Sequence, residues 1–338
     1  MTLPLPSDQA LSLVTKLQKA FVAGLEKCAE HSGLPLQFEW IEWQRNGGEN
    51  GGGSRYVTAN NEVFNRASVN VSHIHYANDP SKKLASATAI STIIHPQNPH
   101  APSVHIHISW TEMKEGNGGY WRVMGDLNPS IAKQEDTDAF RDTLRESAPA
   151  QFDEGVAQGE KYFYIPALDR HRGAIHFYLE QFQSGNTEKD LEMAALFGES
   201  VIQRYLELLA KRLGSEVSEG DRKKQLAYHT LYLLQVLTLD RGTTSGLLVH
   251  NQNDLGIMGS LPSRVDKPLL KSWVSNVHDS QQDLLSEIVD TIPDSGEICS
   301  DVRLNLAQVV RGFYRQNPEA LSQQAAGHVV PPTVENHK

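Results

Sequence analysis

Cysteine is scarce in this chain, and a long apolar run is absent. Only Cys28 and Cys299 occur among the 338 residues, which argues against a disulfide framework and against a zinc site built from paired cysteines. A reducing compartment, the cytoplasm, is therefore expected. No apolar stretch has the length that a membrane-spanning helix needs. The first residues lack the basic region and apolar run of a secretory signal, so none is expected.

An excess of positive charge is also absent. The formal net charge is -10, with 31 Lys and Arg against 41 Asp and Glu, and no long block of Lys and Arg interrupts this balance. A nucleic-acid partner is therefore not expected, although a local cationic pocket can still bind an anionic small molecule. Hydrophobic residues make up 39% and charged residues 21%. Such a composition is typical of a globular protein with a substantial core.

Common cofactor and catalytic motifs are missing as well. The glycine-rich run from Asn46 to Arg55 has neither the spacing of a phosphate-binding loop nor that of a dinucleotide-binding turn. It fits either a mobile hairpin connection or a lid that closes over a ligand. The chain has no nucleophile elbow, no HExxH zinc motif and no EF-hand loop. The candidate site must be sought in other side chains.

The apolar pattern predicts one α+β domain over residues 1–316, with a large, mostly antiparallel sheet. An apolar stripe predicts a first helix from Ser7 to Glu30. Sequential short strands joined by turns favour an antiparallel meander over βαβ units. Strands are expected at 36–45, 67–75, 85–95, 103–111, 120–127 and 161–168, helices at 137–147, 189–212 and 219–228, a hairpin around residues 240–242, and a disordered tail at 317–338.

The stretch 95–129 is the densest in side chains that can carry protons. It holds four of the 14 histidines within thirteen residues. On the predicted strand 103–111, alternation places His105, His107 and Ser109 on one face. The opposite face is expected to be the core, because its residues are Val104, Ile106 and Ile108.

Three interpretations of these histidines are open. They can be partly exposed strand residues that bond to their neighbours. His105 and His107 can instead form an acid–base set. If a hairpin brings His95 close to His105, the cluster would suit zinc, copper or iron. Asp126, on the next predicted strand, either caps a turn or supplies a carboxylate to the same site.

Arginines supply candidate groups for binding anions. Arg170 and Arg172 flank His171 in a short polar stretch, and guanidinium groups bind carboxylates in a fork geometry. Arg241 follows Asp240, where it can bind an anion or pair with that aspartate. A solvated turn is the alternative for both segments.

Several short motifs occur in order between Trp43 and Trp273. They are WQR followed by the glycine-rich run at 43–55, VFNRASVNVSHIH at 63–75, AISTIIHPQNPHAPSVHIH at 89–107, YWRVMGDLNP at 120–129, RG at 172–173, LDRGT at 239–243 and MGSLP at 258–262. Together, and in this order, they resemble the motifs of oxygen-dependent coproporphyrinogen III oxidases.

This resemblance implies a sheet flanked by helices on both faces and a homodimer. The implied reaction is the oxidative decarboxylation of two propionates of coproporphyrinogen III to vinyl groups, which gives protoporphyrinogen IX in haem biosynthesis. Molecular oxygen is the implied co-substrate, and no organic cofactor is needed. Whether a divalent metal takes part is left open. The implied partner is an anionic tetrapyrrole.

The resemblance also implies roles for individual residues. His105 matches the proposed proton donor, and Asp126 matches the aspartate thought to hold the pyrrole N–H groups. His95 matches a proposed metal ligand, with His105 as a second candidate. For substrate binding, Ser91 and Arg172 match residues of the family, and Arg241 lies in a matching motif. His107, Arg122 and Arg170 are candidate replacements for cations that the family carries at other positions.

Two further functions are open, one suggested by departures from the family motifs and one by the histidine cluster. Ser109 stands where the family has an arginine, and 122–124 stand where it has three glycines. Because each buried carboxylate of the substrate needs a partner, these changes favour a non-catalytic tetrapyrrole- or haem-binding relative as one alternative. The other is a metal-dependent enzyme that uses His95, His105 and His107.

Overall fold

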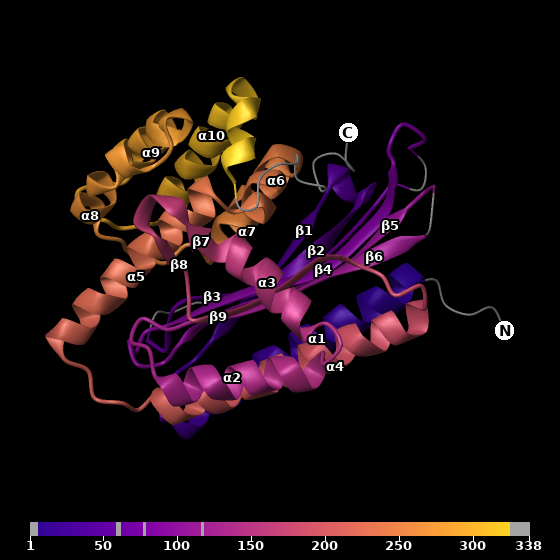
Figure 1. The fold of residues 1–338 in the computed structure, drawn as a ribbon, viewed down its shortest axis with the longest axis horizontal. Helices are drawn as coiled ribbons and strands as arrows, with labels where there is room; N and C mark the ends of the chain where they lie inside the picture. Colours follow the sequence, from indigo (N-terminus) through magenta and orange to yellow (C-terminus); the bar gives the residue numbers. More distant parts are fainter. Residues whose placement is uncertain (1–5, 59–61, 77–78, 116–117, 325–338) are drawn as a thin grey trace. The chain divides into compact units, whose positions relative to one another are not determined.

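The computed structural model describes residues 6–58, 62–76, 79–115 and 118–324. The chain divides into two compact units, Met1–Glu160 with Gly173–Glu216, and Lys161–Arg172 with Val217–Lys338. We describe each unit by itself and use the element labels of Figure 1. Two compact units can belong to one domain or to two, so the single domain over 1–316 stays a prediction.

The first unit is built on a seven-stranded sheet in the order β1-β2-β3-β4-β5-β6-β9 (Figure 1). Every neighbouring pair in it is antiparallel, which confirms the predicted α+β class with a large antiparallel sheet. The strands are β1 Phe38–Gln44, β2 Gly51–Thr58, β3 Phe64–His75, β4 Leu84–Pro96, β5 Ser103–Met113, β6 Gly119–Asn128 and β9 Ile175–Phe182.

Three helices, α1 (Pro6–His31), α2 (Gln134–Ser147) and α4 (Thr187–Arg212), pack with one face of this sheet. The predicted apolar stripe of α1 is buried there. The shared core includes the inward-facing residues Ile90, Ile94, Val104, Ile106, Ile108, Val123, Phe177 and Phe197. The predicted first helix, the five N-terminal strands and the helices at 137–147 and 189–212 are therefore confirmed. Helices on the second face of the sheet stay a prediction.

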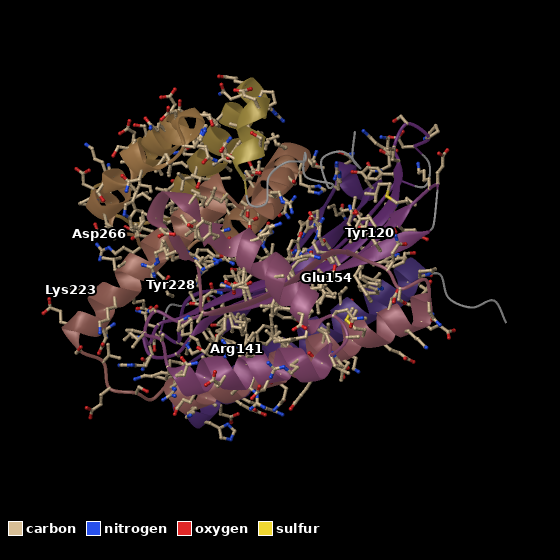
Figure 2. The ribbon with its side chains drawn as sticks, in the orientation of Figure 1. Tyr120, Arg141, Glu154, Lys223, Tyr228 and Asp266 are labelled. Carbon is tan, nitrogen blue, oxygen red and sulfur yellow. The ribbon has the colours of Figure 1, made fainter. Side chains whose placement is uncertain are left out.

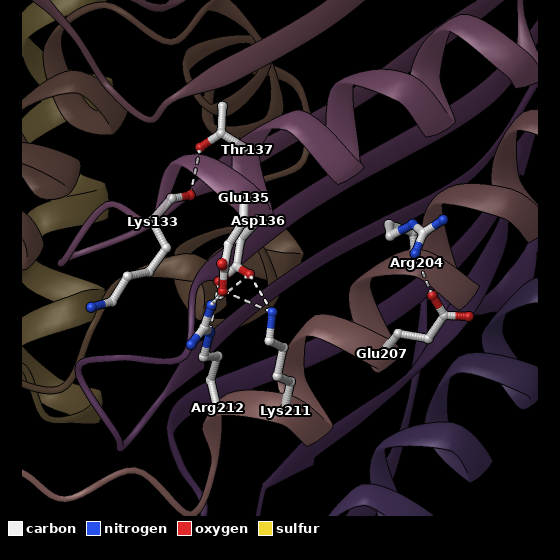
Figure 3. A network of polar contacts seen from close by, with 8 residues as sticks. All are labelled: Lys133, Glu135, Asp136, Thr137, Arg204, Glu207, Lys211 and Arg212. Atoms are coloured by element: carbon white, nitrogen blue, oxygen red, sulfur yellow. Dashed lines mark hydrogen bonds and ion pairs between the residues drawn. The ribbon is translucent and has the colours of Figure 1, made fainter.

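An ion-pair network joins the start of α2 to the end of α4 (Figure 3). Arg212 donates to both carboxylate oxygens of Asp136, from Nε and Nη2 at 2.8 Å each. Glu135 accepts from Lys211 at 2.8 Å and also from Arg212. The two carboxylates raise the pKa of Arg212, so this guanidinium stays charged. The network therefore links α2 to α4 within the first unit.

The second unit is mainly helical. Figure 2 labels Tyr228 and Lys223 on the first long helix of this unit, and also Asp266. The Asp266 side chain caps the helix that begins at Lys267 by accepting a hydrogen bond from Leu269 N–H. The unit contains the short pair β7 Tyr164–Ile165 and β8 Arg170–His171, and the helices α5 Glu219–Thr238, α6 Arg241–Val249, α7 Asp254–Ile257, α8 Lys267–Ser272, α9 Asp279–Thr291 and α10 Ser300–Gln316.

The predicted hairpin around residues 240–242 is wrong. The helix α5 continues to Thr238, and Asp240 caps the next helix, α6, by accepting a hydrogen bond from Thr243 N–H. The residues from Tyr228 to Thr238 are buried on every side of α5. Without a polar face the helical period is invisible, and an apolar run of this kind cannot be told from a strand.

Two other local expectations are also corrected. Residues 161–168 were expected as a strand, but the helix α3 extends from Phe152 to Phe163 and β7 keeps only two residues. The glycine-rich run was expected to be a loop, yet Gly51–Arg55 belong to strand β2. Its glycines fit because β-carbons there would approach backbone carbonyls of β1 and β3 to 2.2 Å.

The predicted disordered tail is described only in part. Residues Pro318–Gln323 form a 3₁₀ helix in which Ala320 and Leu321 are buried. The remainder, 325–338, lies outside the described residues. Within the described part of the chain, no helix has both the length and the apolar character needed to cross a membrane.

The buried His229 on α5 makes stability depend on pH. Burial lowers the pKa of His229 from 6.5 to about 3. Between these values the unfolded chain binds a proton that the folded chain does not, so stability falls as pH drops below 6.5. We expect His229 to cost about 2 kcal/mol of unfolding free energy between pH 7 and pH 5.

Urea unfolding at both pH values, for wild type and His229→Leu, measures this contribution. The free energy of unfolding of His229→Leu should change less between pH 7 and pH 5 than that of wild type. His31→Leu, at an exposed histidine, should keep the wild-type dependence. If the free energy of unfolding changes equally with pH in wild type and His229→Leu, His229 does not cause the pH dependence.

Candidate active site

The two faces of the sheet differ in chemistry. Across β4 and β5, Ser91 lies opposite His107 and Ile93 lies opposite His105. As predicted, His105, His107 and Ser109 share one face, while the residues between them point into the helix-covered core. We call the face that carries His105 the polar face.

A histidine–aspartate pair lies at the centre of the polar face. His105 on β5 is directly opposite Asp126 on β6, and His105 Nδ1 is 3.0 Å from Asp126 Oδ1. The Asp126 side chain is fully buried, whereas the His105 side chain keeps 17% of its surface exposed. A carboxylate acceptor favours the proton on Nδ1, which leaves Nε2 as the nitrogen that exchanges a proton with a ligand. The two predicted catalytic residues are therefore brought together.

Asn128 also forms hydrogen bonds with Asp126. Its Nδ2 donates to Asp126 Oδ2 and, at 3.1 Å, to the Asp126 carbonyl oxygen. Asn128 is fully buried. Each oxygen of the Asp126 carboxylate thus has a partner, so the group is held in one orientation. The sequence analysis missed Asn128, and its only sequence signal is the spacing of two residues that puts it on the same strand face as Asp126.

His176 on β9 was also missed. It lies directly opposite Asp126 on the other side of β6, and its Nδ1 is 2.9 Å from Glu160 Oε1. The His176 side chain is 1% exposed and that of Glu160 is 42% exposed. His176 is separated from Asp126 by fifty residues of sequence, so only the strand pairing could reveal it.

His107 is held neutral. Burial among the strands, followed by the positive charge of Arg122 and by His105, lowers the pKa of His107 to about 3. Its Nε2 is 3.0 Å from Ser109 Oγ, and Ser109 lies opposite Arg122. At neutral pH this part of the polar face therefore offers one guanidinium and one neutral imidazole.

The candidate metal ligands do not form a ligand set. His95 is fully buried, and its Nδ1 is 2.8 Å from Ser103 Oγ. Ile93, not His95, lies opposite His105. Among the described residues, no group of three or more His, Cys, Asp or Glu side chains is arranged to hold a metal ion. The residues present therefore do not fit a metal at His95, His105 and His107, and we derive no step through one.

The remaining predicted arginines belong to the second unit. Arg172 is 1% exposed; its guanidinium lies 4.3 Å from the Phe163 ring centre and 4.8 Å from that of Tyr232. Its Nη1 donates to Gln235 at 2.8 Å. Arg172 thus stabilises its own unit by stacking and hydrogen bonding.

Arg170 and Arg241 have different surroundings. Arg170 is exposed on β8. Arg241 is buried at the start of α6, 5.6 Å from the Tyr162 ring centre. Substrate binding by Arg170, Arg172 and Arg241 stays a prediction.

The fold and the His105–Asp126 pair define an α+β protein with a candidate acid–base site on one face of an antiparallel sheet. The family model described as coproporphyrinogen III oxidase matches residues 9–290. The chain therefore belongs to the coproporphyrinogen III oxidase family, as the motif order predicted.

Two curated relatives agree with this assignment. An oxygen-dependent coproporphyrinogen-III oxidase of Drosophila melanogaster is 28% identical over 273 residues, 74% of this chain and 69% of that protein. A mitochondrial oxygen-dependent coproporphyrinogen-III oxidase of Rattus norvegicus is 27% identical over 281 residues, 76% of this chain and 63% of that protein. The match thus extends over about three quarters of this chain and over less than two thirds of the rat protein.

Proposed function

We propose that this protein is an oxygen-dependent coproporphyrinogen III oxidase. In this proposal it converts two propionates of coproporphyrinogen III to vinyl groups and so forms protoporphyrinogen IX for haem. Family membership supplies the reaction class. The observation that carries the proposal within the chain is the His105–Asp126 pair, with its buried carboxylate and partly exposed imidazole. Molecular oxygen is the proposed co-substrate, without an organic cofactor.

The pair suits the two demands of this substrate. A reduced tetrapyrrole presents pyrrole N–H donors, and the family resemblance assigns the carboxylate of Asp126 as their acceptor. His105 has an exposed edge beside that carboxylate and can exchange a proton with the reacting propionate or with oxygen. Asp126 would thus orient the ring, and His105 would carry the proton.

The polar face also offers groups for the substrate carboxylates. Ser91, His107 and Arg122 lie on this face near the pair. Arg55 on β2 belongs to the same face, because it is opposite Asn70, which is in turn opposite Ser91. A tetracarboxylate can therefore meet two guanidinium groups within the first unit, in keeping with the charge-assisted bonds that anions need.

Arg122 should bind a substrate carboxylate. We expect Arg122→Ala to raise KM for coproporphyrinogen III about 10-fold to 100-fold, the range of one lost hydrogen bond to a charged group, with a smaller change in kcat. Arg141→Ala, at a partly exposed arginine of α2 labelled in Figure 2, is the matched control and should leave KM unchanged. A wild-type KM in Arg122→Ala would remove Arg122 from the binding site.

The decisive test of the function is aerobic incubation of the protein with coproporphyrinogen III, with products identified by mass. The expected result is the loss of carbon dioxide from two propionates. Porphyrin binding without turnover would instead establish a tetrapyrrole-binding relative, and the enzymatic proposal would be wrong.

We also propose a homodimer in the cytoplasm. The homodimer rests on family resemblance, and sedimentation equilibrium of the purified chain tests it directly. The cytoplasmic location rests on the scarcity of cysteine. The rat relative carries the word mitochondrial in its name, so cell fractionation with an antibody to this chain is the test.

A further inference from the structure

Oxidative decarboxylation consumes protons as well as oxygen. A propionate that becomes a vinyl group loses carbon dioxide, one proton and two electrons. Dioxygen takes up as many protons as electrons on its way to peroxide or to water. Each propionate therefore draws one proton from solvent. A flat tetrapyrrole seated on His105 would cover the edge through which this imidazole meets water, so the proton needs another entry.

Glu160 and His176 connect the protein surface to the interior beside the site. Glu160 is the half-exposed end, and His176 is enclosed. The helix α3 brings them together because it has no side chain at Gly159, where a β-carbon would come within 2.8 Å of His176 Cβ. Glu160, the next residue, then reaches His176 Nδ1 at 2.9 Å.

The inner end of this connection lies beside Asp126. His176 and Asp126 are opposite each other on neighbouring strands, and such pairs place their β-carbons about 5 Å apart. The β-carbon position of Gly173 lies 3.0 Å from His176 Nε2 and 2.6 Å from Asn128 Oδ1. His176 Nε2 and Asn128 Oδ1 therefore both lie next to Gly173, and Asn128 Nδ2 donates to Asp126.

We propose that Glu160 and His176 form the proton entry route to the Asp126–His105 pair, an inference that rests on the proposed function. A proton bound at Glu160 passes to His176 Nδ1, and His176 releases its Nε2 proton to Asp126, directly or through one water. A protonated Asp126 pairs with the tautomer of His105 that carries its proton on Nε2. From this tautomer His105 gives its Nε2 proton to the reduced oxygen while Nδ1 takes the proton of Asp126, which restores the charged carboxylate and the Nδ1–H tautomer. Glu160 and His176 touch neither substrate nor oxygen; they act through Asp126.

The first test separates proton transfer from a structural role. Glu160→Gln keeps an acceptor for His176 but cannot be protonated, so we expect kcat to fall at least 10-fold with KM unchanged and a larger solvent deuterium isotope effect on kcat. His176→Ala should show the same loss and recover part of it with added imidazole. Glu154→Gln, at an exposed glutamate of the same helix labelled in Figure 2, is the control. A wild-type kcat in Glu160→Gln would overturn the proposal.

A second test does not depend on turnover. In the free protein, Glu160→Gln should shift the ¹⁵N signals of the His105 ring, because both imidazoles are linked through Asp126. Unmoved His105 signals would overturn the relay even if the enzyme is active. If wild type makes no product, the proposed function fails, and the NMR result alone then decides whether the two histidines are coupled.

Discussion

Substitution of His105 by alanine is expected to lower kcat for coproporphyrinogen III by about 10²- to 10⁴-fold, the range for loss of a positioned proton-transfer group. KM should change little, because the carboxylate-binding groups remain. His105 is 3.0 Å from the buried Asp126, so Asp126→Asn should cause a loss of similar size: the amide keeps the shape of the side chain but removes the negative charge. The measurement is the rate of product formation under air.

Two controls make this prediction specific. His31→Ala removes an exposed histidine of α1 and should keep wild-type kcat. Circular dichroism of each variant should match wild type, since His105 lies on the polar face and outside the apolar core. Full activity in either His105→Ala or Asp126→Asn would place the chemistry elsewhere in the chain.

Substitution of Gly173 by alanine is expected to destabilise the first unit by about 2–4 kcal/mol. Gly173 has φ of +90°, which a side chain disfavours, and the added β-carbon would lie 2.6 Å from Asn128 Oδ1 and 2.9 Å from the Leu127 carbonyl oxygen. Because Asn128 orients Asp126, the folded fraction should also lose activity.

Urea unfolding followed by circular dichroism measures the stability change, and assays below the unfolding midpoint measure activity. Gly214→Ala is the matched control, since a β-carbon there would have no neighbour within 4 Å and its φ is ordinary. Gly173→Ala and Gly214→Ala with the same stability would show that the contacts around Gly173 relax without cost.

The sheet at the site could be predicted because one of its faces is apolar. On β5, Val104, Ile106 and Ile108 alternate with polar residues, and a period of two specifies both the strand and the face that holds His105. The helix α5 could not be predicted to its full length, because burial on all sides removes the polar stripe that reveals a helix.

Some residues of the site could likewise be predicted from the sequence and others could not. His105 and Asp126 were found from motifs that lie close together in the chain. Asn128 was missed because its hydrogen bond to Asp126 within β6 has only a spacing of two residues as its sequence signal. His176 was missed because only the pairing of β6 with β9 places it opposite Asp126. Register also decides which residue is directly opposite His105: it is Ile93 and not His95.

By itself, the sequence determined the α+β class, the polarity of the two sheet faces, the family and the candidate catalytic residues His105 and Asp126. These properties follow from the spacing of apolar residues along each strand or helix and from the order of the motifs. Only the tertiary structure decided which side chains meet: the orientation of Asp126 by Asn128, the neutral state of His107 beside Arg122, and the connection from Glu160 to His176. The physical reason is that contacts between distant segments follow from strand register and burial, which no single segment encodes.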